Sequence, residues 1–145
     1  MRKTLVVVES LQKKIPIDLP RVGKIVRTIL KYEGVRDASL AIAFVSSTKI
    51  RSLNRQYLQR NYLTDVLAFD LREDKKSKGV SGDIAICVDV AIRNAKSYQT
   101  SLDRELVLYV AHGILHLLGY DDHKPVDIRK MRKKEQEILG YLDIR

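Results

Sequence analysis

The stretch from Leu106 to Leu118 constrains the fold most, because its residues are apolar almost all the way round a helix. A helix without a polar face has to be covered by other elements, so we expect a buried, central helix here. Gly119 suits the end of that helix, because glycine accepts the left-handed backbone found at many helix ends. The side chains that break the apolar pattern most sharply are the imidazoles of His112 and His116.

The rest of the chain alternates between short apolar runs and segments of helical periodicity. The runs predict strands at Thr4–Val8, Leu40–Val45, Thr64–Phe69 and Asp83–Val88, and the periodic segments predict helices from Pro20 to Gly34, over Thr48–Leu58 and over Val90–Tyr98. The last two strands are expected to form a hairpin around a charged loop, residues 72–79. A final helix is expected to begin at Asp127 as its cap, with Met131 on its inward face. Interleaved strands and helices indicate a mixed α/β (α+β) fold, in which helices cover a four-stranded mixed sheet, and 145 residues fit one domain, 1–145.

Composition excludes a disordered chain and a membrane-spanning one. Apolar residues make up 45% of the chain and charged residues 31%, which is typical of a globular domain. No run approaches the roughly 18 consecutive apolar residues of a membrane span. Cys87 is the only cysteine, so it has no disulfide partner within the chain, and a reducing compartment suits it. We therefore expect a cytoplasmic protein without a membrane span or a disulfide.

All three histidines of the chain fall within residues 112–123. His112 and His116 stand one helical turn apart, so both rings project from one face, as in helices that give a zinc ion two nitrogen ligands. The turn at Gly119 can bring His123 back toward them. We expect one Zn²⁺ per chain on these three histidines, although imidazole also suits nickel, copper and iron. Three protein ligands leave a fourth position for water, which is typical of catalytic zinc sites.

The neighbours of the histidines narrow the chemistry. The metal-bearing helix is metzincin-like in its spacing, but the metzincin pattern places the third ligand three residues after the glycine, and that residue is Asp122. Asp122 is therefore the alternative to His123. Metallopeptidases carry a glutamate general base after the first histidine, where this chain has Gly113, so peptide hydrolysis is disfavoured. Asp121 and Asp122 are candidates to orient the ligands or to take a proton from the bound water.

Positive charge is concentrated in the first part of the chain. The formal net charge is +9, and residues 1–60 alone carry thirteen basic and four acidic side chains. The two helices expected there have basic outer faces, which carry Arg21, Lys24, Arg27, Lys31, Arg51 and Arg55. Such a surface favours a phosphate-backbone partner, so we expect these residues to bind RNA. The alternative is a solvated face whose ion pairs reflect adaptation to heat.

The chain contains a motif that runs from His112 through Gly113, Leu115, His116 and Leu117 to Gly119-Tyr120-Asp121 and ends in a final histidine. This motif resembles the signature of the YbeY family. Two further motifs support the resemblance, Leu53-Asn54-x-x-Tyr57 with Thr64-Asp65-Val66-Leu67-x-Phe69, and Gly82-Asp83-Ile84. The resemblance implies a bacterial metal-dependent endoribonuclease that acts in ribosomal RNA maturation and ribosome quality control. The family's arginine after the tyrosine is Leu58 here, its following aspartate is Asn61, and a second aspartate precedes the last histidine. Arg60 is the nearby candidate for the missing cation.

The leading hypothesis is therefore a zinc-dependent endoribonuclease specific for single-stranded RNA, with ribosomal RNA and the ribosome as its partners. In this hypothesis Arg60 and Asp121 join the metal ligands as catalytic residues. The first alternative is a metzincin-like metallopeptidase. The second is a ribosome-assembly factor that zinc stabilises and that does not cut RNA.

Overall fold

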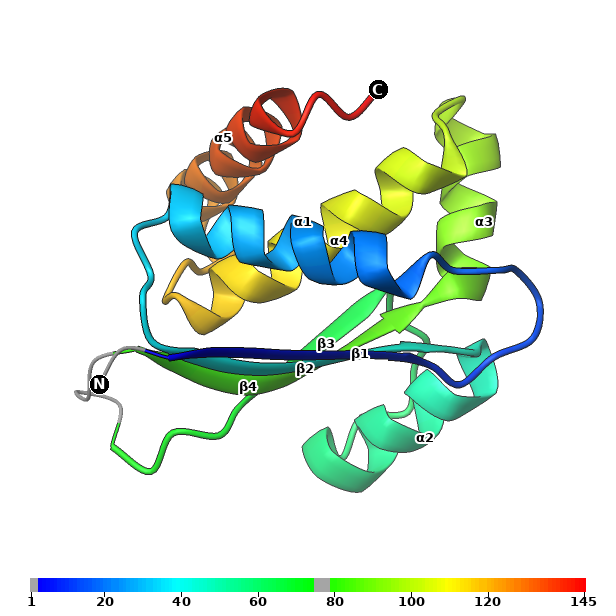
Figure 1. Cartoon of the computed structure of the whole chain (residues 1–145). Helices are drawn as coiled ribbons and strands as arrows, with labels where there is room; N and C mark the ends of the chain where they lie inside the picture. Colours follow the sequence, from blue (N-terminus) through cyan, green and yellow to red (C-terminus); the bar gives the residue numbers. More distant parts are fainter. Residues whose placement is uncertain (1–2, 75–78) are drawn as a thin grey trace.

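The computed structural model describes residues 3–74 and 79–145 (Figure 1). The elements follow one another along the chain as β1 (Thr4–Ser10), α1 (Leu19–Tyr32), β2 (Ala38–Val45), α2 (Ser47–Leu58), β3 (Val66–Asp70), β4 (Val80–Cys87), α3 (Val88–Tyr98), α4 (Leu102–Leu117) and α5 (Pro125–Tyr141). The predicted mixed α/β fold is confirmed, and each predicted strand and helix overlaps an observed one. Of the predicted charged loop, residues 75–78 lie outside the described residues. No helix in the described part of the chain is both long and apolar enough to cross a membrane.

The four strands form one mixed sheet in the order β1-β2-β4-β3. β1, β2 and β4 run parallel, and β3 pairs antiparallel with β4, which confirms the predicted hairpin. β3 is therefore an edge strand, and its neighbour β4 is central. The predicted buried strand in the middle of the sheet is β2, whose Leu40, Ile42 and Phe44 are almost completely buried.

Helices cover the two faces of the sheet unequally. Figure 1 shows α1, α3, α4 and α5 on one face and α2 alone on the other. The larger core lies under the four helices, whereas a smaller core of Val45, Ile50, Leu67, Ala85, Cys87 and Val90 lies on the α2 side. Cys87 is completely buried and acts as a small apolar side chain in this smaller core.

Helix α4 is the central helix that its apolar sequence predicts. Ser101 caps its first turn by accepting a hydrogen bond from the Arg104 amide, and Gly119 follows its end with a φ of 100°. Two glycines let the helix approach the sheet closely: a Cβ at Gly113 would lie 2.8 Å from Ile84, and one at Gly82 would lie 2.8 Å from Leu117. This close packing fixes the position of the two histidines of α4 relative to the sheet.

Helix α5 begins earlier than the sequence predicted. Its first residue is Pro125 and its cap is Lys124, so the prediction of a cap at Asp127 is wrong. Proline is favoured at the first helical position because its φ is already helical and it lacks the amide that would be left without a partner. Met131 is buried on the inward face, as expected.

Candidate metal centre

His112 and His116 project from the same face of α4, one turn apart. Their ring centroids lie 5.0 Å from each other and the rings meet edge to face. Both side chains are partly exposed, at 23% and 33%. The two rings therefore lie at the boundary between the core and solvent, where a ligand can reach them.

Glu135 of α5 holds the ring of His112 from behind. Its Oε2 lies 2.5 Å from Nδ1 of His112, and the carboxylate is only 10% exposed. An ionised carboxylate can only accept a hydrogen bond, so this contact requires a proton on Nδ1. In the neutral ring the lone pair is then on Nε2, the atom that faces away from Glu135.

Asp122 faces the other side of both rings. Its Oδ2 lies 3.5 Å from Nε2 of His112 and 3.4 Å from Nε2 of His116. In the neutral tautomer that Glu135 imposes, the Nε2 atom of His112 directs a lone pair at a carboxylate, which is unfavourable unless a cation lies between them. A tetrahedral zinc ion with bonds of about 2.0 to 2.2 Å separates two ligand atoms by about 3.3 to 3.6 Å. The observed spacing therefore fits a divalent cation held by His112, His116 and Asp122, whose ligand atoms all lie within 4.8 Å of one another.

The surroundings of His112 favour positive charge at this position. Burial lowers the pKa of His112, but the hydrogen bond to Glu135 and the charge of Glu135 raise it. The charges of Asp65 and Asp122 raise it further, and the net result is a pKa above the ordinary value of histidine. The same negative groups that stabilise a proton on this ring would stabilise a metal cation beside it.

The structure places His123 outside this arrangement. Its side chain is 78% exposed, and its Nε2 lies 3.4 Å from Oδ1 of Asp121. Oδ1 of Asp121 also accepts hydrogen bonds from the backbone amides of Asp122 and His123, so Asp121 fixes the shape of the loop. A second group of potential ligands, Asp121, Asp122 and His123, lies on this loop. The structure thus brings Asp122 next to the two rings, and His123 as third ligand stays a prediction.

The packing around Gly113 leaves no room for a glutamate base directly after His112. Its position faces the sheet, where a Cβ would already lie 2.8 Å from Cγ2 of Ile84. A glutamate side chain there would be forced into packed core, and it would lie on a different face of α4 from His112. Packing as well as residue type therefore disfavours the glutamate base of the metallopeptidases at this position.

Arg60 lies in the loop between α2 and β3. It is exposed, its side chain donates a hydrogen bond to the hydroxyl of Tyr62, and its amide donates to the carbonyl of Asn54. Asn54 is completely buried and donates to the carbonyl of Tyr62, which anchors the loop. The same loop ends at Asp65, whose charge raises the pKa of His112.

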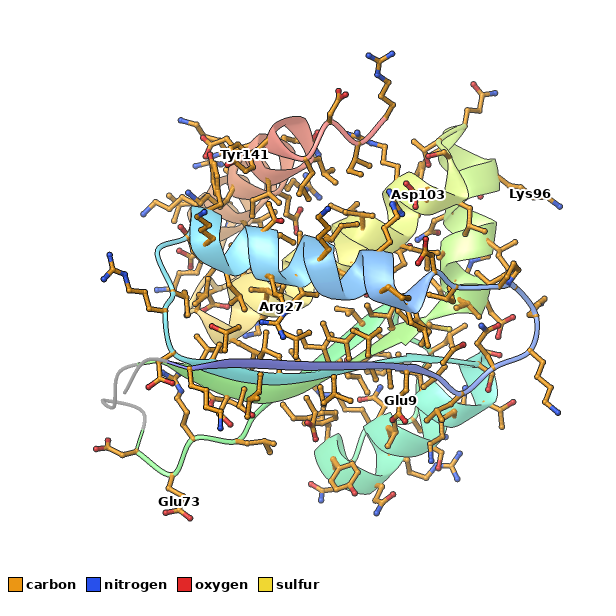
Figure 2. The ribbon with its side chains drawn as sticks, viewed as in Figure 1. Glu9, Arg27, Glu73, Lys96, Asp103 and Tyr141 are labelled. Carbon is orange, nitrogen blue, oxygen red and sulfur yellow. The ribbon has the colours of Figure 1, made fainter. Side chains whose placement is uncertain are left out.

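The six basic residues predicted to bind RNA do not form one surface. Arg51 and Arg55 lie on α2, on the opposite side of the sheet from α1. On α1, the guanidinium of Arg21 forms two hydrogen bonds with Asp103, at 2.7 and 2.9 Å. Arg27 extends toward the sheet, as Figure 2 shows, and donates to the carbonyl of Thr4. Lys24 and Lys31 are exposed on the same helix.

A groove of about 630 Å³ lies on the α2 side of the sheet, away from the histidines. Its lining includes Glu9, Lys49, Tyr57 and Asp83, and Figure 2 shows Glu9 on this side. None of the candidate metal ligands lines it. We place the chemistry at the histidines, because ligand geometry identifies a reactive centre more specifically than the size of a hollow does.

Sequence reasoning missed Glu135. The signal was available, because Met131, Glu135 and Ile138 share the inward face of α5 at helical spacing. A glutamate among inward-facing apolar residues needs a partner, since burial of an unpaired carboxylate is costly. Which partner it has could not be read from the sequence, because His112 lies 23 residues away on another helix.

The chain is similar to several known proteins. The family model described as Endoribonuclease YbeY matches residues 7–143. A protein of that name from Carboxydothermus hydrogenoformans is 39% identical over 140 residues, which cover 94% of this chain and 96% of the relative. Another from Syntrophus aciditrophicus is 36% identical over 142 residues, which cover 94% and 89%.

Two further similarities differ in extent. The relative of the same name from Anaeromyxobacter dehalogenans is 45% identical over 105 residues, and the chain spans only 54% of its length. A protein of Thermotoga maritima, solved in solution, superposes with a TM-score of 0.65 and 27% identity, over 96% of this chain and 92% of that one.

Proposed function

Because the chain belongs to the Endoribonuclease YbeY family, we propose that it is a zinc-dependent endoribonuclease that cuts single-stranded RNA in the cytoplasm. Its proposed context is the maturation of ribosomal RNA and the quality control of ribosomes. The observation that carries the proposal is the spacing of the two Nε2 atoms from the Asp122 carboxylate, 3.5 and 3.4 Å, which suits a tetrahedral divalent ion.

The residues of the centre have separable tasks in this proposal. Glu135 keeps the proton of His112 on Nδ1, so that Nε2 stays available as a ligand. When bound, the zinc ion supplies Lewis-acid stabilisation of the charge on the scissile phosphate. Arg60 is the proposed cation for an RNA phosphate near the cut, because it is exposed on a loop that leads to the centre. Asp121 is the proposed acid–base group, held on the same loop as Asp122.

Cleavage of a labelled RNA oligonucleotide tests this function. The strand is incubated alone and annealed to its complement, with the wild-type protein and with His116→Ala, in the presence and absence of a chelator. We expect the single strand to be cut, the duplex to survive, and both chelation and His116→Ala to stop cleavage. A zinc-loaded protein that leaves the single strand intact would refute the endoribonuclease proposal and favour a binding role without cleavage.

Elemental analysis tests the ligand set independently of activity. Wild-type protein, His112→Ala, Asp122→Ala and His123→Ala are purified under the same conditions, and their zinc content is compared. We expect one zinc per wild-type chain and none in His112→Ala. Loss in Asp122→Ala supports the arrangement seen in the structure, whereas loss in His123→Ala alone supports the three-histidine prediction and requires the loop 121–123 to rearrange.

A further inference from the structure

The outer face of α5 carries a group of basic side chains that the charge distribution along the sequence did not reveal. The α5 cationic face consists of Arg129, Lys130, Arg132 and Lys133, all of them exposed. They lie within five consecutive residues, and their spacing brings them to one side of the helix. The only other residue of this stretch, Met131, points into the core.

These four cations differ from the basic residue that follows them in how they are paired. Among the residues that the structure describes, none forms an ion pair with them. Lys134, the next residue, behaves differently: its Nζ lies 3.0 Å from Glu33 and 3.7 Å from Glu137, and it is partly buried. The α5 cationic face is therefore available to an anionic partner, whereas Lys134 is used within the fold.

Several acidic groups of this half of the chain are engaged elsewhere. Residues 61–145 carry equal numbers of acidic and basic side chains, so their net charge is zero. Glu135 is buried against His112, and Asp122 faces the two rings. Asp89 and Asp103 pair with Lys14 and Arg21 of the first half. A half of the chain whose formal charge is zero therefore contains a local concentration of positive charge on α5.

The patch is connected to the candidate metal centre through one rigid element. Helix α5 begins two residues after His123, and its inward face supplies Glu135 to His112. Figure 1 shows α5 in the outer layer of helices, on the same side of the sheet as α4. An anionic chain bound along the outer face of α5 would therefore be held beside the centre.

The chemistry of the patch favours a nucleic acid backbone over a membrane surface. A membrane-binding helix needs an apolar face that inserts into the lipid. Met131, Ile138 and Leu139 of α5 are buried in the core, and its exposed apolar residues, Val126 and Tyr141, lie at opposite ends of the helix and form no continuous apolar face. Exposed lysines and arginines without an apolar face suit phosphates in solution.

We propose that the α5 cationic face binds the phosphate backbone of single-stranded RNA and holds it beside the metal centre. This inference rests on the proposed function. It moves the principal RNA contact away from α1, where Arg21 is already paired with Asp103 and Arg27 is bound to the backbone of β1.

A matched pair of variants tests the assignment. The α5 variant combines Arg129→Gln, Lys130→Gln, Arg132→Gln and Lys133→Gln, and the α1 variant combines Arg21→Gln, Lys24→Gln, Arg27→Gln and Lys31→Gln. Each removes four charges, and glutamine has nearly the helix propensity of lysine and arginine. Zinc content and melting temperature are measured first and are expected to be unchanged in the α5 variant.

Binding of a fluorescent single-stranded RNA with 2′-O-methyl sugars, chosen to resist cleavage, is then followed by anisotropy between about 50 and 200 mM salt. We expect the α5 variant to bind on the order of 100-fold more weakly at about 0.1 M salt, and the slope of log K against log salt to fall by about 2.8, because each contact contributes about 0.7. The α1 variant is expected to change little. If the wild-type protein binds and cuts RNA, and the α5 variant binds RNA with the same affinity and the same salt dependence, this inference is overturned and the proposed function stands. Wild-type protein that neither binds nor cuts RNA would overturn both.

Discussion

Replacing Glu135 by glutamine tests the central feature of the candidate metal centre. The substitution keeps the size of the side chain and an oxygen that can accept from Nδ1 of His112, but it removes the negative charge. Loss of a carboxylate that orients a ligating histidine typically weakens metal binding by about 10- to 100-fold, or about 1.4 to 2.7 kcal/mol. The contact is short, at 2.5 Å, and the carboxylate is only 10% exposed, so we expect an effect near the upper end of that range.

In the metal-free protein, Glu135→Gln should lower the free energy of unfolding by less than it lowers the free energy of zinc binding. A hydrogen bond to a charged group contributes about 1 kcal/mol more than one between neutral groups, which corresponds to a melting temperature lower by about 2 to 4 °C for a chain of this length. Competition with a chromogenic chelator measures the zinc affinity, and calorimetry with the chelator in excess measures the stability.

Glu137→Gln is the matched control for this experiment. Glu137 lies on the same helix, its side chain is 41% exposed, and its pair with Lys134 spans 3.7 Å. An exposed pair of that length contributes at most about 1 kcal/mol, and zinc affinity should not change. Wild-type zinc affinity in Glu135→Gln would refute the conclusion that Glu135 positions His112 as a ligand.

Three further predictions follow from the same geometry. Gly82→Ala should destabilise the protein by about 1 to 3 kcal/mol, because the new Cβ would lie 2.6 Å from the Phe69 carbonyl, and an unchanged denaturant midpoint would contradict this. Asn54→Ala should cost about 1 to 3 kcal/mol and reduce RNA cleavage, since the buried Asn54 amide holds the loop of Arg60 through the Tyr62 carbonyl; chemical denaturation and the cleavage assay measure the two effects. The raised pKa of His112 should stabilise the metal-free fold fully below the unfolded value of about 6.5, and this stabilisation should be lost as the pH rises through the higher folded value. With zinc the sign reverses, because a ligand ring must be unprotonated, so melting curves with and without zinc between about pH 5 and 9 should converge toward acid and separate toward base.

The secondary structure could be predicted because its signals are local. The apolar sequence of α4 and the alternation in the strands depend on neighbouring residues, so the elements were found with small errors at their ends. The predicted start of α5 is wrong because Asp127 is a favourable capping residue, whereas the helix begins at Pro125, a residue type favoured at the first helical position. The strand order and the isolation of α2 on one face depend on long-range pairing, for which the chain gives no local signal.

The part of the candidate site that depends on local spacing could also be predicted from the sequence. The pair His112 and His116 follows from helical spacing, which fixes the direction of both side chains. The third ligand depends on the path of the loop after Gly119, where one extra residue exchanges Asp122 for His123. Asp121 accepts two backbone hydrogen bonds in this loop, and this local turn places the carboxylate of Asp122 beside the rings.

Charge summed along the sequence does not show which charges are already paired in the fold, so the predicted RNA contacts of the first sixty residues stay a prediction. The first sixty residues carry the whole excess of positive charge, yet two of their basic residues form ion pairs with the second half of the chain. Lys14 pairs with Asp89, and Arg21 pairs with Asp103. Those pairs remove acidic groups from the second half as well, and burial of Glu135 removes another. The α5 cationic face lies in the half whose formal charge is zero, so a sum along the sequence does not reveal it. The inward face of the same helix supplies Glu135 to His112, so the proposed RNA-binding surface and the carboxylate that contacts the candidate ligand belong to one helix. The proposed RNA contact and the proposed metal centre would therefore be coupled through the packing of α5.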